Sequence, residues 1–218
     1  NLRFKTGKRK KIWNKNCLSI GLASGFMEPL ESTSIHLIQS TIMRFFSLFP
    51  HKADFEVEMN YFNNSIDEEF KSIRDFLVLH YKLTTRDDSE LWNYCRNMGI
   101  PDSLKEKLEL YKSGSWIERN NKELFGVDSW LAVLNGQTAQ ANSYNPLVDT
   151  LPESELEKIM QDTREVLSQC ASSMPDHEDF ILKNCASKNS QLAKNQIETF
   201  PKPSLNPPPK TWKLVINQ

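Results

Sequence analysis

The sequence has little glycine and no glycine-rich nucleotide motif. Only 7 of its 218 residues are glycine, and neither G-x-G-x-x-G nor G-x-x-x-x-G-K occurs. The chain by itself therefore lacks a familiar means of cradling the phosphates of a nucleotide cofactor. It begins at Asn1 rather than at methionine, and residues 2–12 have the alternation of two short strands joined by a turn at Gly7. We expect a protein that is incomplete at its N-terminus.

Several other features are missing, and each excludes a class of protein. No window holds 18 uninterrupted apolar residues, and no apolar segment follows the basic residues near the N-terminus, so neither a membrane span nor a secretory signal is predicted. The net charge of -1 gives no general attraction to nucleic acid. The four cysteines show no C-x-x-C spacing and the histidines no metal spacing, so we expect no metal and free thiols in a cytoplasmic protein. These are Cys17, Cys95, Cys170 and Cys185.

Most of what the sequence does contain predicts helix. Apolar residues recur at intervals of three and four between residues 58 and 83, which is typical of a long helix packed along one side. The segment 34–49 is apolar on nearly all sides, so a buried helix is predicted there. A mostly apolar run at 17–22 suits a buried strand. The fold class is therefore mainly α with a short β segment ahead of it. Further helices are predicted at 89–98, 101–114, 127–135, 152–172 and 175–185.

The segment 16–35 is the most informative part of the chain. A short apolar strand leads into a turn that carries Glu28 and Glu31, and an apolar helix follows the turn. Backbone N–H groups at a helix start bind anions, so Thr33 and Ser34 offer an anion site beside an acid/base group. The alternative is that a carboxylate and the hydroxyl groups only cap the helix, which is common for these residue types.

The histidines and tryptophans give weaker signals. His36 lies in the first turn of the apolar helix and is expected to be a satisfied core residue. For His80, packing or a structural hydrogen bond is expected. The large side chains of Trp92, Trp116 and Trp130 suit either an aromatic pocket or the core, and tryptophans on helices are more often core residues.

The segment from Trp13 to Ile38 resembles the flavin-dependent halogenases, the group usually called tryptophan halogenases. The similarity is densest in E-P-L-E-S-T at 28–33. A second block agrees, with I-R-D-F at 73–76, L-H-Y-K at 79–82 and R-D-D at 86–88. A third, looser block spans 129–149. The resemblance covers residues 4–150 well and 151–186 weakly, and it implies the C-terminal part of an α/β, flavin monooxygenase-like fold with a helical body.

The resemblance also implies a division of the chain. Residues 1–50 would form the end of the flavin-binding and substrate sheet, with the buried helix that carries the halide site. Residues 51–186 would form a helical region on the substrate side. Five prolines fall in 187–218, at Pro201, Pro203, Pro207, Pro208 and Pro209, and this composition predicts a mostly disordered tail.

In this family, reduced FAD from a separate flavin reductase and O₂ convert a halide into hypohalous acid, which halogenates an electron-rich aromatic compound. The resemblance assigns the catalytic glutamate to Glu31. It assigns halide binding to the backbone amides of Thr33 and Ser34, and flavin contact to Leu22 and Ile35. The expected partners are the transiently bound reductase, an aromatic small molecule and, as an option, a second copy of the chain.

Three departures limit what the resemblance implies. The family's nucleotide motif and catalytic lysine belong before Asn1, so this chain alone is expected to be inactive. Ser34 stands where the family often has glycine. Region 112–130 lacks the tyrosine cluster that clamps free tryptophan, so an indole, a phenol or a larger aromatic is favoured. Two alternatives remain open: a flavin monooxygenase that does not halogenate, and a non-catalytic, truncated helical module.

Overall fold

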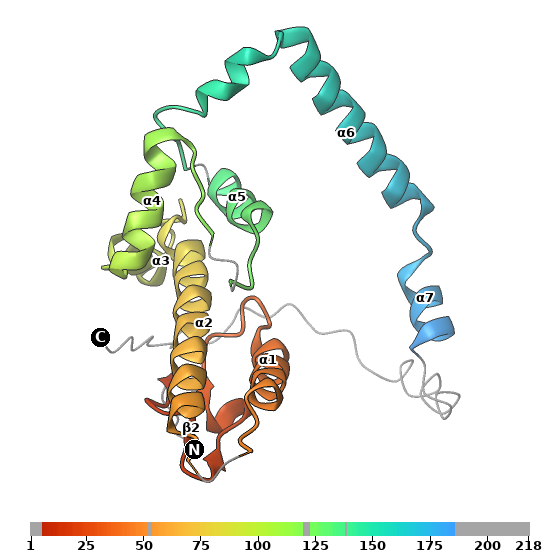
Figure 1. Ribbon diagram of the computed structural model, residues 1–218. Coiled ribbons are helices and arrows are strands. Elements are labelled where there is room, and N and C mark those ends of the chain that lie inside the picture. The colour runs from red at the N-terminus through yellow and green to blue at the C-terminus, as the bar shows by residue number, and fades with distance from the viewer. Residues whose placement is uncertain (1–5, 52–53, 120–122, 138, 186–218) are drawn as a thin grey trace. The chain divides into compact units, whose positions relative to one another are not determined.

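The computed structural model describes residues 6–51, 54–119, 123–137 and 139–185 (Figure 1). The chain divides into two compact units, Asn1–Asn145 and Pro146–Gln218, and each is described by itself. The prediction of a mainly α chain with a short β segment is confirmed. The tail predicted at 187–218 lies outside the described residues.

The first unit is built around the long helix α2 (Glu56–Lys82), which fills the region where the sequence predicts a helix at 58–83. Its buried positions repeat at helical spacing, as in Phe62, Ile66, Phe70 and Ile73. Four shorter helices and strand β2 contact it, and Figure 1 shows them around α2. These helices are α1 (Ser34–Ser47), α3 (Glu90–Asn97), α4 (Asp102–Gly114) and α5 (Val127–Gly136).

The β segment differs from the prediction. It consists of β1 (Gly7–Lys8), β2 (Trp13–Asn14), β3 (Cys17–Leu18) and β4 (Gly25–Phe26). Antiparallel pairing joins β2 to β3 and β1 to β4, so Gly7 lies opposite Phe26 rather than at the tip of a hairpin. The prediction of a buried strand at 17–22 is wrong in two respects: the strand ends at Leu18, and within it Cys17 is exposed and Leu18 is half-buried. Gly21 has a φ of 63°, which ends extended structure and begins the short 3₁₀ helix η1 (Gly21–Ala23).

The β segment is fixed to α2 through Asn63 and Trp13. The Asn63 side-chain oxygen accepts hydrogen bonds from the amides of Ile12 and Trp13, at 2.8 and 3.0 Å, and its Nδ2 donates to the Trp13 carbonyl at 2.8 Å. The buried Trp13 ring stacks on Phe55 and meets Phe45 edge-on, with centroids 5.4 and 5.0 Å apart. One amide side chain thus satisfies backbone groups that a longer sheet would pair.

A second core lies further along α2. Phe76 stacks on Phe125 at 3.9 Å and meets the Trp130 ring at 5.1 Å. At the end of α4, a Cβ on Gly114 would lie 2.5 Å from Nε1 of Trp116, so only glycine lets that ring pack there. The chain then leaves the helix through Ser115, whose φ is 60°. The buried members of this core are Phe76, Leu79, Leu104, Tyr111, Trp130 and Leu134.

The prediction that the helix at 34–49 is buried on nearly all sides is wrong for this chain. Of α1, Thr41 is the buried residue, while Phe46 and Ile35 expose 66% and 69% of their surface. Met43 and Phe49 are exposed on the same helix. Among the described residues, α1 packs mainly against α2 and η1, and its Phe45 also meets the Trp13 ring, so the apolar side chains on its other face are uncovered.

The second unit contains the 3₁₀ segment η2 (Pro146–Thr150) and the helices α6 (Glu153–Ser173) and α7 (His177–Asn184). Glutamates at 153 and 155 load the N-terminal turn of α6, as the helix dipole favours. Asp176 caps α7 by accepting from the amides of Glu178 and Asp179. In the described parts of the chain, no helix combines the length and the apolar character that crossing a bilayer needs.

Candidate active site

Glu31 lies in a tight turn that ends at the start of α1. The amide of Ser32 donates to the carbonyl of Pro29 at 2.8 Å, which closes the turn around Leu30 and Glu31. Ser32 then has a φ of 51°, a left-handed conformation that non-glycine residues seldom adopt. Strain of this kind persists only where surrounding contacts fix the backbone, so we expect the carboxylates that flank Ser32 to be held by other residues.

The carboxylate of Glu31 contacts His80, near the C-terminal end of α2. Oε1 of Glu31 lies 3.0 Å from Nε2 of His80. The other ring nitrogen, Nδ1, is 2.8 Å from the carbonyl of Phe76, one helical turn earlier. The sequence predicts a structural hydrogen bond for His80, and this one exists. Its contact with Glu31 is not apparent from the sequence, because no local pattern joins residues so far apart.

Glu28, the other carboxylate of the turn, is bound to Tyr81. Burial, together with the charge of Glu28 and a hydrogen bond to it, raises the pKa of Tyr81 to about 12. Oε2 of Glu28 is buried and has no hydrogen-bond partner among the described residues. Neither glutamate caps α1, so the capping alternative is wrong for both side chains.

The N-terminus of α1 offers unpaired backbone amides. Thr33 occupies the N-cap position, but its side chain makes no cap hydrogen bond. The first amide of α1 that has an acceptor is that of Leu37, which donates to the backbone carbonyl of Thr33 at 2.9 Å. Within the described chain, the amides of Ser34, Ile35 and His36 have no hydrogen-bond acceptor. Such a turn carries partial positive charge and suits a small anion.

A buried ion cluster fixes α1 against α2. Glu69 of α2 exposes only 4% of its side chain, and it meets two basic side chains of α1. Nε2 of His36 lies 2.9 Å from Oε1, and Nη1 of Arg44 lies 2.8 Å from Oε2. His36 therefore has a hydrogen-bond partner, as the sequence predicts, but its side chain is 38% exposed, so the prediction of a core residue is wrong. The cluster sets the position of the helix whose N-terminus adjoins Glu31.

Leu22 and Ile35 are highly exposed apolar side chains. Leu22 is 74% exposed, at the middle of η1, and Ile35 is in the first turn of α1. η1 packs against α1 with Gly21 beside Ile38; a Cβ at Gly21 would fit at 3.5 Å from Ile38, so the φ of 63° rather than a lack of space favours glycine there. The two elements present an apolar surface next to the free amides, which suits contact with a flat, largely apolar ring.

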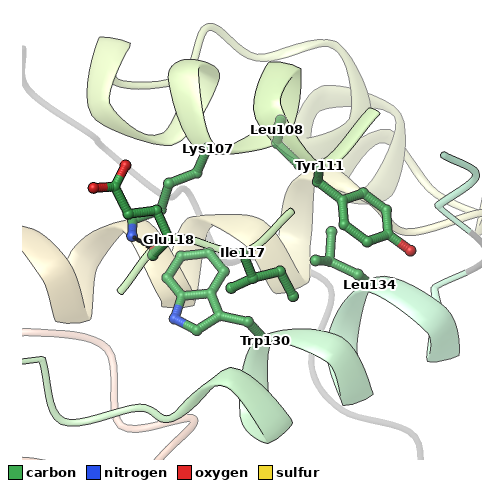
Figure 2. Close-up of a pocket in the computed structure, with 7 residues that line it drawn as sticks. All are labelled: Lys107, Leu108, Tyr111, Ile117, Glu118, Trp130 and Leu134. Carbon is green, nitrogen blue, oxygen red and sulfur yellow. Dashed lines mark hydrogen bonds between the residues drawn. The ribbon is translucent and has the colours of Figure 1, made fainter. Parts of the chain in front are cut away.

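The tryptophans do not form a substrate pocket together. Trp130 is a core residue, and it borders a cavity of about 10 Å³, room for about one water, shown in Figure 2. Nζ of Lys107 lies 5.1 Å from the centre of its ring. Trp92 stacks on Tyr81 instead, with centroids 6.2 Å apart. In the described part of the chain, no group of three or more His, Cys, Asp or Glu side chains is placed to bind a metal ion.

The sequence model of the tryptophan halogenase family matches residues 1–153. The chain belongs to this family. Among the curated relatives, tryptophan 6-halogenase ThaL of Streptomyces albogriseolus is 40% identical over 114 residues, which are 52% of this chain and 22% of that protein. Tryptophan 7-halogenase KtzQ of Kutzneria sp. is 35% identical over 118 residues, which are 54% of this chain and 22% of that protein.

Solved halogenase structures agree with the fold. BrvH, a flavin-dependent halogenase from Brevundimonas sp. BAL3, is similar with a TM-score of 0.76 and 36% identity, over 82% of this chain and 36% of that structure. A flavin-dependent halogenase from Xanthomonas campestris gives a TM-score of 0.80 and 38% identity, over 85% and 38%. The chain thus spans about a third of these structures and about a fifth of the curated relatives named above.

Proposed function

We propose that this chain is the C-terminal part of a flavin-dependent halogenase that halogenates an electron-rich aromatic compound. The observation that carries the proposal is the arrangement around α1, where Glu31 lies three residues before Ser34, the first of the unpaired amides of Ser34, Ile35 and His36. The names of the relatives support the reaction class, since they are tryptophan halogenases and flavin-dependent halogenases.

The residues present fit a halide and one face of a flavin. The N-terminal turn of α1 supplies backbone N–H groups for an anion of halide size, and Thr33 and Ser34 are the positions that would hold it. Leu22 and Ile35 would contact the flavin ring through their exposed apolar side chains. When bound, reduced FAD supplies the O₂-derived oxidant that turns halide into hypohalous acid.

Glu31 has the role of the catalytic carboxylate. Its side chain is 34% exposed, so one side of the carboxylate contacts His80 while the other remains accessible to a ligand. A carboxylate held this way orients a halogenating species by accepting a hydrogen bond. It also accepts the proton that the aromatic ring loses after halogen transfer.

For the substrate, we propose an indole, a phenol or a larger aromatic rather than free tryptophan. Region 112–130 contributes Trp116, Phe125 and Trp130 as its large aromatic side chains, and Trp130 is buried in the core. Phe125 stacks on Phe76 within the core, which leaves Trp116 as the exposed ring of this region. The proposed partners are a flavin reductase and, as an option, a second copy of the protein, in a cytoplasmic setting.

The test is aromatic halogenation by the full-length protein. Reduced FAD, O₂ and bromide are supplied with an indole or phenol probe, and products are analysed by mass spectrometry with and without bromide. Brominated product in the wild type, and loss of most turnover in Glu31→Gln, would support the proposal. Glu68→Gln is the matched control, because Glu68 is an exposed residue of α2 that pairs with Lys71. Hydroxylated product with no bromination would instead support the flavin monooxygenase alternative.

A further inference from the structure

Two consecutive residues of α2, His80 and Tyr81, each lie beside one of the two carboxylates of the turn, Glu31 and Glu28 respectively. His80 lies 3.0 Å from Glu31, and Tyr81 lies near enough to Glu28 for that carboxylate to raise the pKa of its hydroxyl group. The turn between the two glutamates is short and is closed by its own hydrogen bond at Ser32. The contacts at its two ends therefore restrict both its position and its rotation.

Both α2 side chains are themselves held in place. The His80 ring is fixed by the contact of Nδ1 with the Phe76 carbonyl, and the Phe76 ring meets it edge-on at 4.8 Å. The Tyr81 ring stacks on Trp92, and the Arg86 guanidinium lies 4.6 Å from the centre of the Trp92 ring. Because the supporting groups have fixed rotamers, the restriction reaches the turn.

The contacts of His80 also fix the place of a proton. A carbonyl oxygen only accepts hydrogen bonds, so Nδ1 carries hydrogen where it meets Phe76. A lone pair on Nε2 would repel the carboxylate of Glu31 at 3.0 Å. One proton therefore lies between Nε2 and Oε1, which leaves Oε2 of Glu31 as the oxygen for a ligand.

We propose that His80 and Tyr81 are positioning residues for Glu31: His80 by engaging Oε1, and Tyr81 by holding Glu28 at the other end of the turn. The inference rests on the proposed function for its effect on turnover. The contacts themselves do not depend on that function, so they are testable separately. Neither residue is expected to touch the substrate, and their loss lowers kcat much more than it raises KM for the aromatic substrate.

The first experiment measures the imidazole nitrogens of His80 by ¹⁵N NMR in the 218-residue chain. We expect Nδ1 to be protonated and the Nε2 shift to change in Glu31→Gln, while Glu68→Gln leaves it unchanged. A spectrum with the proton on Nε2 only, or one unchanged by Glu31→Gln, overturns the inference. This measurement needs no flavin, halide or activity.

The second experiment compares matched variants in the full-length protein with bromide and an indole probe. His80→Asn keeps a donor for the Phe76 carbonyl and loses the contact with Glu31, so kcat is expected to fall about tenfold to a hundredfold. His80→Gln keeps an amide donor near the Nε2 position and is expected to regain most of that loss. Tyr81→Phe keeps the ring stacking and removes the hydroxyl, with an expected fall of about fivefold. Tyr94→Phe, an exposed tyrosine of α3, is the control.

The outcomes separate the two claims. If wild-type kcat persists in His80→Asn, or if KM rises instead while kcat stays constant, the positioning role is wrong. If the wild-type protein itself does not halogenate, the proposed function fails, and the NMR result alone then decides whether His80 holds Glu31.

Discussion

Removing Arg44 should destabilise the first unit by leaving Glu69 as a poorly compensated buried charge. The Glu69 side chain is 4% exposed, and Arg44 provides one of its two basic partners, at 2.8 Å. Removing one partner of a fully buried pair costs about 3–5 kcal/mol. His36 still contacts Oε1, and Arg44 is itself 21% exposed, so the expected cost of Arg44→Met is smaller, about 2 kcal/mol.

The double variant separates the charge effect from lost packing. In Arg44→Met/Glu69→Met, the buried carboxylate is gone, and apolar replacement of a buried ion pair is often neutral. We therefore expect the double variant to be more stable than Arg44→Met alone. Lys105→Met is the control, because its ion pair with Glu109 at 3.8 Å is exposed on both sides, so its loss should change the free energy of unfolding much less than the loss of Arg44 does.

The assay is urea unfolding of the 218-residue chain followed by tryptophan fluorescence, since Trp13 and Trp130 are buried in the two cores. In thermal unfolding of the same variants, a cost of about 2 kcal/mol corresponds to a fall in Tm of roughly 4–8 °C for a unit of this size. The reasoning is refuted if Arg44→Met costs no more than Lys105→Met. It is equally refuted if the double variant is less stable than the single one.

Three further predictions concern other parts of the chain. Comparison with Tyr81→Phe identifies the phenol absorbance of Tyr81, which in the wild type should titrate with a pKa of about 12, and Glu28→Gln should lower that pKa. Because the folded-state pKa is raised, the stability contributed by Tyr81 is complete below about pH 10 and is lost as pH rises toward 12. Titration of this tyrosine near 10 would contradict the Glu28 contact. Burial raises the pKa of Cys95, so a thiol reagent should modify the three exposed cysteines quickly and Cys95 only on unfolding; equal rates at all four sites would refute this. Phe46→Glu should reduce self-association of the 218-residue chain in light scattering without lowering its Tm, because the Phe46 side chain is exposed on the uncovered face of α1; unchanged association would show that this face is not responsible.

The helices could be predicted because their signals are local. Apolar spacing predicts the extent of α2, Pro101 marks the start of α4, and Gly136 marks the end of α5, each within a few residues. The strands could not, because strands of two residues are too short for alternation to fix their register. The wrong prediction for α1 has another cause: apolar composition indicates that a surface is to be covered, but not whether the covering partner lies within this chain.

The candidate site was predictable to the extent that it is contiguous. Glu31, Thr33 and Ser34 lie within four positions of one another, so a single segment brings the carboxylate to the helix start. His80 and Tyr81 come from the far end of α2, and only the packing of α1 against α2 brings them to the turn. The same packing depends on Glu69, whose partners His36 and Arg44 are likewise distant in sequence.

The most direct test of the central claim is bromination of an indole or phenol probe by the full-length protein with reduced FAD, O₂ and bromide. The wild type is predicted to give a product with the isotope pattern of one bromine, Glu31→Gln is predicted to lose most of it, and Glu68→Gln is predicted to keep it. Bromination by Glu31→Gln at the wild-type rate, or no brominated product from any variant, would contradict the account.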